Sequence, residues 1–359
     1  MKKFVPFSGA YPTADIQFLL NKIDMEMTDV EAKEALIQSG KRHYSEMLSQ
    51  ENPPTRQHLD IFAKAMDQHA GRMAKETVML AKALCDEFGD TPVVLVSLVR
   101  AGAPLGVMLQ RALRHMGKES YHYGVSIIRD RNLDPAAMDY IEKKHGTEGI
   151  VFVDGWTGKG AITGELIKSL KEREGYPAYP RLVVLADPCG CAWLSASTDD
   201  WLIPFGIMGA PVSGMVSRSV WADDDFHGCV YCGHLQEFEC GNLLVDTVEN
   251  LMKELDFNEI PSAKSVHKGN APLRAMSKHV VETLVEKYDV NSTNRIKPGI
   301  AEATRAVLRR VPDHVLVQSA QDPDVALLVH LAKEKGITVT EVGDEIGQYR
   351  AVTIIKKVL

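Results

Sequence analysis

Glycines, hydroxyl side chains and one acid gather in the stretch Ile150–Thr163, IVFVDGWTGKGAIT. A buried strand is expected to end at Asp154, followed by a glycine-rich loop and then by a helix. The backbone N–H groups of such a loop and the positive end of the helix together favour a bound dianion. A carboxylate at the strand end is placed to accept hydrogen bonds from ribose hydroxyls. The predicted phosphate-binding residues are Asp154, Gly155, Thr157, Gly158, Lys159, Gly160 and Ala161.

A second loop of similar character lies upstream, in SLVRAGAP at residues 97–104. It also follows an apolar run and precedes a helical pattern. An arginine beside small residues lets a guanidinium group and backbone amides hold a diphosphate. Catalytic groups of parallel sheets cluster in the loops after the strands, so two such loops favour one shared anion site. The predicted binding residues of this loop are Ser97, Arg100, Ala101 and Gly102.

Other nucleotide-binding loops compete for the glycine-rich stretch. A Walker A loop is excluded, because Lys159 is followed by Gly160 and no glycine stands at the first position of that motif. A dinucleotide fingerprint stays open, since Gly158, Gly160 and Gly164 are spaced G-x-G-x-x-x-G and Asp187 ends the next predicted strand. The alternatives are therefore an NAD(P)-dependent oxidoreductase and a tight strand–helix turn without a ligand. The acid before the loop and the upstream loop favour the sugar-phosphate site.

Two further segments would complete an enzyme site. SIIRDR, at residues 126–131, follows another predicted strand and resembles a mobile hood, with Arg129 and Arg131 joining Asp154 as predicted catalytic residues. A solvated loop is the alternative. The segment 199–221 is apolar yet rich in Gly, Ser and Pro, which is typical of a buried, shaped loop. We expect it to form the acceptor pocket, with Ser213, Ser217 and Arg218 as its polar residues.

The six cysteines allow two more hypotheses. Cys229-x-x-Cys232 is half of a zinc site, but the spacing to other ligands matches no standard finger, so no metal ligand is assigned. A cysteine nucleophile needs a base and an oxyanion hole, and Cys189 or Cys191 is the best candidate. Buried, inert thiols are the favoured interpretation of the set.

The apolar pattern places the two loops on a parallel α/β sheet. Short apolar runs at residues 91–98, 121–128, 149–155 and 181–187 alternate with helical patterns, as strands buried on both faces do. The 359 residues suffice for two or three domains, and a net charge of −7 does not favour nucleic acid binding over the whole surface. The sequence shows neither an apolar run that would span a bilayer nor a signal-peptide core, so a cytoplasmic location is expected.

A polar stretch at residues 259–275 reads as a linker between two units. The predicted domains are therefore 1–258 and 276–359. The second contains helical patterns, one of them opening after Pro298-Gly299, and three apolar runs that indicate strands. This combination predicts a compact α/β sandwich, which is within the size range of an independent domain.

These loops, the segment GKRHYSEM at residues 40–47 and the C-terminal unit together resemble the phosphoribosyltransferase–Pelota fusion family. That family is found in bacterial tellurite-resistance and stress gene clusters and is also labelled StiP-like and as a cysteine protease. The resemblance implies a type I phosphoribosyltransferase fold, transfer from phosphoribosyl diphosphate to an unknown acceptor, Mg²⁺ as cofactor, and a homodimer as one assembly. Two departures stand out: Gly155 replaces the usual second acid, and Gly158-Lys159 replaces the usual pair of threonines.

The last unit resembles the Pelota-like fold of kink-turn-binding proteins, on PGIAEATRAVLRR at residues 298–310 and on residues 322–339. The resemblance implies an RNA partner, whose phosphates a helix start and nearby cations would contact with a steep dependence on salt. No aromatic platform is evident here, so base stacking is not expected. A non-catalytic RNA-binding regulator is the remaining hypothesis. The predicted RNA-binding residues are Lys297, Gly299, Glu302, Thr304, Arg305 and Arg309.

Overall fold

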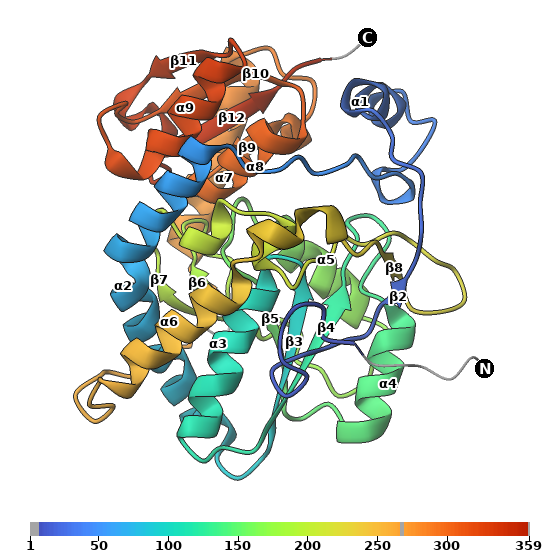
Figure 1. The fold of residues 1–359 in the computed structure, drawn as a ribbon, viewed down its shortest axis with the longest axis vertical. Helices are drawn as coiled ribbons and strands as arrows, with labels where there is room; N and C mark the ends of the chain where they lie inside the picture. The colour runs from blue at the N-terminus through green and yellow to red at the C-terminus, as the bar shows by residue number, and fades with distance from the viewer. Residues whose placement is uncertain (1–6, 266–268, 358–359) are drawn as a thin grey trace.

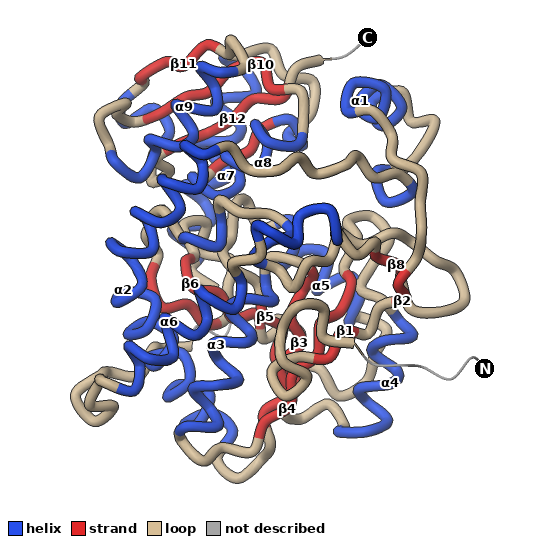
Figure 2. The backbone as a smooth tube through the Cα atoms, in the orientation of Figure 1, coloured by secondary structure: helices blue, strands red, loops and turns tan. Residues whose placement is uncertain are grey.

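The computed structural model describes residues 7–265 and 269–357 and is built on two main sheets (Figure 1). The larger sheet has six strands in the order β1-β4-β3-β5-β6-β7, and the smaller has four in the order β11-β10-β12-β9. Figure 2 shows the helices as a layer around each sheet. Among the described residues, no helix is both long and apolar enough to cross a membrane.

All strand pairs of the larger sheet are parallel. The four apolar runs expected to be strands form β3, β4, β5 and β6, which confirms the predicted α/β class with a parallel sheet. Two short edge strands, β1 and β7, were not predicted. The six strands are β1 (Gln17–Phe18), β3 (Val93–Val99), β4 (Ser120–Ser126), β5 (Ile150–Val153), β6 (Leu182–Ala186) and β7 (Leu194–Ser197).

Helices cover both faces of this sheet, as the continuous apolar strands require. Successive side chains of a strand point to opposite faces, so Val93 and Leu95 of β3 pack into one core while Val94 and Val96 pack into the other. The first core is shared with α2 (Arg56–Phe88), α3 (Gly102–His115) and α6 (Gly241–Lys253). The second is shared with α4 (Pro135–His145) and α5 (Ala161–Leu170).

The smaller sheet forms the C-terminal unit together with three helices. Strand β10 pairs parallel with β11 and antiparallel with β12, which also pairs antiparallel with β9. Helix α7 begins at Ala271, inside the predicted linker, because the Asn270 side chain caps it by accepting from Leu273 N. The predicted boundaries at 258 and 275 stay a prediction. The elements are α7 (Ala271–Lys287), β9 (Ile296–Pro298), α8 (Ile300–Arg309), β10 (Pro312–Val317), α9 (Ala326–Glu334), β11 (Thr338–Glu341) and β12 (Ala351–Ile355).

The remaining elements lie around the opening between the two sheets or connect the units. Helix α1 (Val30–Gln38) lies beside the C-terminal unit (Figure 1). Strands β2 (Asn21–Lys22) and β8 (Gly228–Cys229) form a small parallel pair. The 3₁₀ turns are η1 (Tyr44–Glu46), η2 (Pro204–Gly206), η3 (Ala210–Val212), η4 (Gly233–Phe238), η5 (Thr293–Arg295), η6 (Pro323–Val325) and η7 (Gly343–Ile346).

Buried acids join the two units. Asp200 accepts hydrogen bonds from the backbone N–H of Ile300 at 2.9 Å and of Arg350 at 2.8 Å. Asp324 of the C-terminal unit accepts from Leu202 N at 3.2 Å and lies 3.3 Å from the His69 imidazole of α2. Since these acids are almost fully buried, the C-terminal unit is docked firmly against the larger sheet.

Candidate functional site

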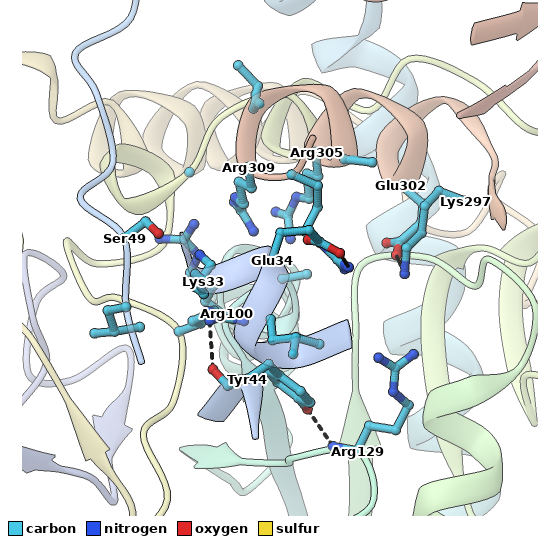
Figure 3. A pocket seen from close by; sticks show the side chains of 18 of the residues that line it. Lys33, Glu34, Tyr44, Ser49, Arg100, Arg129, Lys297, Glu302, Arg305 and Arg309 are labelled. Atoms are coloured by element: carbon cyan, nitrogen blue, oxygen red, sulfur yellow. Dashed lines mark hydrogen bonds and ion pairs between the residues drawn. The ribbon is translucent and has the colours of Figure 1, made fainter. Parts of the chain in front are cut away.

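A cavity of about 1570 Å³ separates the two units. Its walls are the loops after β3, β4 and β5, helix α1, the segment 208–219 and helix α8. The carboxyl ends of parallel strands lie at one edge of a sheet, which brings the first three loops together. Figure 3 shows Arg305 and Arg309 extending from α8 toward Arg100 and Lys33 across this space.

Most of the residues singled out from the sequence line this cavity, including Arg100 and Asp154, which were expected to face one site. Six do not line it. They are held by packing or by local hydrogen bonds. The predicted residues that line the cavity are Arg100, Ala101, Arg129, Arg131, Asp154, Thr157, Gly158, Lys159, Gly160, Ala161, Ser217, Arg218, Lys297, Glu302, Arg305 and Arg309.

The six other residues support the walls from behind. Ser97 Oγ contacts His122 Nε2 at 2.7 Å and donates to Gly102 O at 3.0 Å. Ser213 Oγ donates to Gly209 O at 2.9 Å, and Thr304 is fully buried. A Cβ on Gly102 would lie 2.1 Å from Val153 O, one on Gly155 would lie 2.8 Å from the Phe205 ring, and Gly299 has φ +91°. Among the six, the glycines therefore allow close backbone packing instead of facing a ligand.

The predicted phosphate loop is occupied by the C-terminal unit. Lys159 Nζ donates to Ile296 O at 2.9 Å and also to Thr293 O. Tyr349 Oη donates to Gly158 O at 2.7 Å. Thr157 Oγ1 turns inward to Asp187 Oδ1 at 2.6 Å. The groups expected to hold a sugar phosphate are thus used for packing and for contacts between the units.

Asp154 does not fit a divalent cation. Burial raises the pKa of its carboxyl to about 7, although the Gly155 N–H opposes this. A magnesium site needs ionised oxygen ligands, and Gly155 supplies no second carboxylate. Among the residues that the structure describes, no cluster of three or more His, Cys, Asp or Glu side chains could hold a metal ion. The Mg²⁺ cofactor expected from the sequence stays an untested prediction.

Cations dominate the opposite part of the cavity. Arg100 pairs with Glu51 at 2.7 Å, and although burial opposes it, Arg100 lowers the pKa of Glu51 to about 2. Arg218 donates to Tyr44 O at 2.8 Å and to Met47 O at 2.9 Å. The side chain of Arg309 forms no ion pair or hydrogen bond with another described residue, and burial together with Arg100 and Arg305 lowers its pKa. The cavity therefore holds more positive charge than its own acids neutralise.

The two arginines of the predicted hood lie on a structured turn after β4. Arg129 N donates to the Tyr44 hydroxyl at 2.7 Å, a contact drawn in Figure 3, and its guanidinium donates to Asn294 Oδ1 at 3.1 Å. Arg131 pairs with Glu46 and lies 4.3 Å from the Trp221 ring. The hood is thus held in place by η1 and by the C-terminal unit.

Several cavity residues were missed by sequence reasoning. Lys33, Glu34 and Glu51 come from segments without a motif, and Trp156 was passed over within the glycine-rich loop. Glu34 forms two hydrogen bonds with the Arg310 guanidinium, at 2.6 and 2.8 Å. These side chains come from segments far apart in the sequence and meet only through tertiary contacts such as the Glu34–Arg310 pair, so no local spacing could have signalled them.

The cysteines differ in their access to the cavity. Cys232 lines it, together with His234 and His58, whereas the other five described cysteines do not. Cys189 and Cys191, the candidates favoured from the sequence, are buried between Thr163, Asp187 and the C-terminal core. Among the described residues no histidine is hydrogen-bonded to a cysteine; His234 Nε2 lies 2.9 Å from Glu51 O.

A comparison with solved structures gives a weak likeness to the hypoxanthine phosphoribosyltransferase of Trypanosoma cruzi. The two share 16% sequence identity and a TM-score of 0.28, over 38% of this chain and 81% of that one. A likeness of this size carries no argument about the activity. The C-terminal unit is matched more specifically, because residues 275–357 fit the family model of the PELOTA RNA binding domain.

The larger unit is matched by a different family. Residues 9–249 fit the family model described as tellurite-like stress resistance cysteine protease StiP. The cysteine protease StiP of Acinetobacter baylyi is 47% identical to this chain, over 98% of the chain and 94% of that protein. The predicted phosphoribosyltransferase activity is therefore wrong, and so is the predicted use of phosphoribosyl diphosphate, which agrees with the contacts that the C-terminal unit makes with the glycine-rich loop. The cysteine-protease alternative is favoured instead, and the chain belongs to the StiP family of tellurite-like stress resistance cysteine proteases.

Proposed function

We propose that this chain is a cysteine-dependent hydrolase of polypeptides that acts in the cavity between its two units, with Cys232 as the nucleophile. One observation carries the proposal: Cys232 is the one cysteine among the described residues that lines the cavity. Although Cys232 is 6% exposed, its place in the cavity wall sets it beside any polypeptide bound there. The names of the matched family and of the Acinetobacter baylyi relative support the reaction class.

The surroundings of Cys232 combine packing with nearby cations. The residue immediately precedes η4 and packs with Ala210, Met215 and Leu235. Burial raises the pKa of the Cys232 thiol, whereas the Arg100 guanidinium lowers it. Because the thiolate is the reactive form, the Arg100 guanidinium favours the reactive state of Cys232, although it also pairs with Glu51. Loss of Arg100 would therefore suppress the thiolate further.

His234 is the proposed general base. It lies two residues after Cys232, lines the same cavity, and is exposed enough to turn away from Glu51 O. Catalytic hydrogen bonds are often long or absent in a free enzyme and form when substrate binds. In the proposed reaction the thiol proton passes to His234, the sulfur forms a thioester with the substrate carbonyl carbon, and the amine leaves with that proton. Water then hydrolyses the thioester and restores the thiol.

Substitution of Cys232 tests this assignment. We expect Cys232→Ser to abolish hydrolysis of a fluorescently labelled casein, while Cys85→Ser retains it, because Cys85 lies on α2 away from the cavity and contacts Met116. Thermal unfolding of both variants shows whether each remains folded. Full activity in a folded Cys232→Ser protein would refute the assignment.

RNA is the proposed partner of the C-terminal unit, on the basis of the Pelota match. Of the six predicted RNA-binding residues, four line the cavity and two support the start of α8 from behind. Lys297 lies 3.9 Å from Glu302, so this pair presents a partly neutralised edge, whereas Arg305 and Arg309 supply net positive charge. The narrower fold assignment, a phosphoribosyltransferase-like sheet that has lost that reaction, is supported by the meeting of the loops after β3 and β5 at the cavity. The homodimer and the cytoplasmic location stay predictions.

A further inference from the structure

We infer that the cavity between the two units binds a single strand of RNA, with its phosphates held between α8 and the loops after β3 and β4, and that this RNA shields Cys232. The inference about the strand stands on the cavity alone. The shielding of the nucleophile rests on the proposed function.

The orientation of α8 is the first reason. Glu302, Arg305 and Arg309 follow the spacing of one helix face and line the cavity. The other face of α8 packs into the C-terminal core through Ala303 and Val307. The helix therefore presents its cations to the cavity, as Figure 3 shows, and not to the outer surface. RNA that contacts these side chains has to enter the space between the units.

Cations in the cavity with donor groups that lack a partner are the second reason. Lys33 is only 5% exposed, lines the cavity, and its ammonium group makes no ion pair or hydrogen bond with a described residue. Arg100 is 6% exposed and its Nε has no partner, and one terminal nitrogen of Arg305 is likewise buried and unpaired. Arg309 is also unpaired. A buried donor on a cation costs free energy when it has no partner, so these groups are suited to a ligand that brings several negative charges.

The mutual repulsion of these cations supports the same conclusion. Burial and the Arg218 guanidinium lower the pKa of Lys33 to about 7, and burial and Arg100 lower that of Arg305 to about 10. A bound phosphate chain would reverse these shifts, because it places a negative charge beside each group.

Aromatic rings between the cations distinguish RNA from an acidic polypeptide. Trp156 and Tyr44 line the cavity, and the Arg305 guanidinium lies 4.5 Å from the Trp156 ring. Arg218 lies 5.3 Å from the Tyr44 ring. Alternating rings and guanidinium groups are typical of sites where bases stack while phosphates are neutralised. The prediction that no stacking platform exists concerned the C-terminal unit alone. Both rings belong to the larger unit.

The shape of the cavity favours one strand over a duplex. Its volume of about 1570 Å³ exceeds the roughly 300–1,000 Å³ of pockets for small ligands, so it accommodates a short piece of polymer. Helix α1 closes one side, held by the Glu34–Arg310 pair and by Gln38 Nε2 donating to Lys356 O at 3.0 Å. A rigid duplex would have to displace this helix, whereas a flexible strand can thread beneath it.

Fluorescence anisotropy with a labelled oligouridine of about eight nucleotides tests the site. We expect the full chain to bind this strand more tightly than a blunt RNA duplex of equal length, with polyglutamate unable to displace it. Arg309→Gln should weaken binding about tenfold and reduce the slope of log affinity against log salt by about 0.7. Lys278→Gln removes an exposed charge on α7, outside the cavity, and should change neither quantity. Equal binding of strand and duplex, displacement by polyglutamate, or unchanged binding by Arg309→Gln would overturn the inference.

Alkylation by iodoacetamide, followed residue by residue with mass spectrometry, tests the shielding. We expect the oligouridine to slow modification of Cys232 at least about fivefold, in line with occupancy of the site, and to leave Cys85 unaffected. Protection should disappear in Arg309→Gln. An unchanged rate for Cys232 at saturating RNA would refute the shielding. Cys232→Ser should still bind the strand, so loss of RNA binding and loss of hydrolysis remain separate outcomes.

Discussion

Asp200 should contribute more to stability than any exposed acid beside it, and its replacement by alanine is the sharpest test of how the two units are joined. The carboxylate is 7% exposed and accepts from Ile300 N at 2.9 Å and from Arg350 N at 2.8 Å. The N-cap residue of helix α8 is Gly299, which has no side chain to cap the helix, so Asp200 caps it from the other unit.

The expected magnitude follows from these two bonds. Asp200→Ala leaves two buried backbone N–H groups without an acceptor, and each costs about 1–3 kcal/mol. Loss of a negative charge at a helix start adds about 0.5 kcal/mol. We therefore expect the free energy of unfolding to fall by about 3 kcal/mol, with Asp200→Asn between this value and that of the native protein because its amide oxygen still accepts one bond.

Asp199 provides the matched control. Its side chain is 50% exposed and forms one ion pair with Arg72 at 3.1 Å, so Asp199→Ala should cost less than about 1 kcal/mol. Urea denaturation at neutral pH gives the free energies of unfolding, and hydrogen exchange reports the protection of the Ile300 and Arg350 amides. Equal losses for the two variants, or unchanged exchange at both amides in Asp200→Ala, would show that this reasoning is wrong.

Two further predictions concern charges inside the cavity. Because burial raises the pKa of Asp154 to about 7, the native state keeps a proton that the unfolded chain releases near pH 4, so stability falls as pH rises between these values. Asp154→Asn should abolish this fall and should be more stable than the native protein by about 1–2 kcal/mol at pH 8. Urea denaturation midpoints measured at pH 5 and at pH 8 test this expectation. If the stability of the variant and that of the native protein changed equally with pH, the expectation would be wrong. Glu34→Gln removes the charge that pairs with Arg310, so the free energy of unfolding should fall by about 2 kcal/mol. Helix α1 should also become more sensitive to proteases. Limited proteolysis that proceeds as in the native protein would contradict this prediction.

The sequence predicted the sheet well because its strands are local and apolar. Val93–Val99 and Ile150–Val153 are continuous buried runs, and their parallel pairing follows from the helices between them. The two-residue edge strand β1 has no such signal, since it pairs with β4 across more than a hundred residues. Its position depends on tertiary contacts that no local pattern encodes.

The site was predicted only in part, for a similar reason. The loops at Arg100 and Asp154 converge as expected, because strand ends of a parallel sheet share an edge. What fills the loop could not be foreseen: Lys159 and Gly158 are contacted by residues more than a hundred positions away. The motif was thus recognisable from the sequence. The groups expected to bind phosphate are instead used for contacts with the C-terminal unit. The same docking explains why Cys232, and not Cys189 or Cys191, lines the cavity.

Helix α2 has a mechanical consequence for the whole molecule. Its 33 residues extend about 50 Å in all, and the part from His69, which faces Asp324 of the C-terminal unit, to Phe88 in the core of the larger unit covers about 29 Å. Helix α2 therefore connects the C-terminal unit on one side of the cavity with the core of the larger unit on the other. A rotation of the C-terminal unit requires α2 to bend or to lose its contact with Asp324. We therefore expect motion that widens the cavity to reach the opposite end of the protein, where α2 packs on α3 and α6.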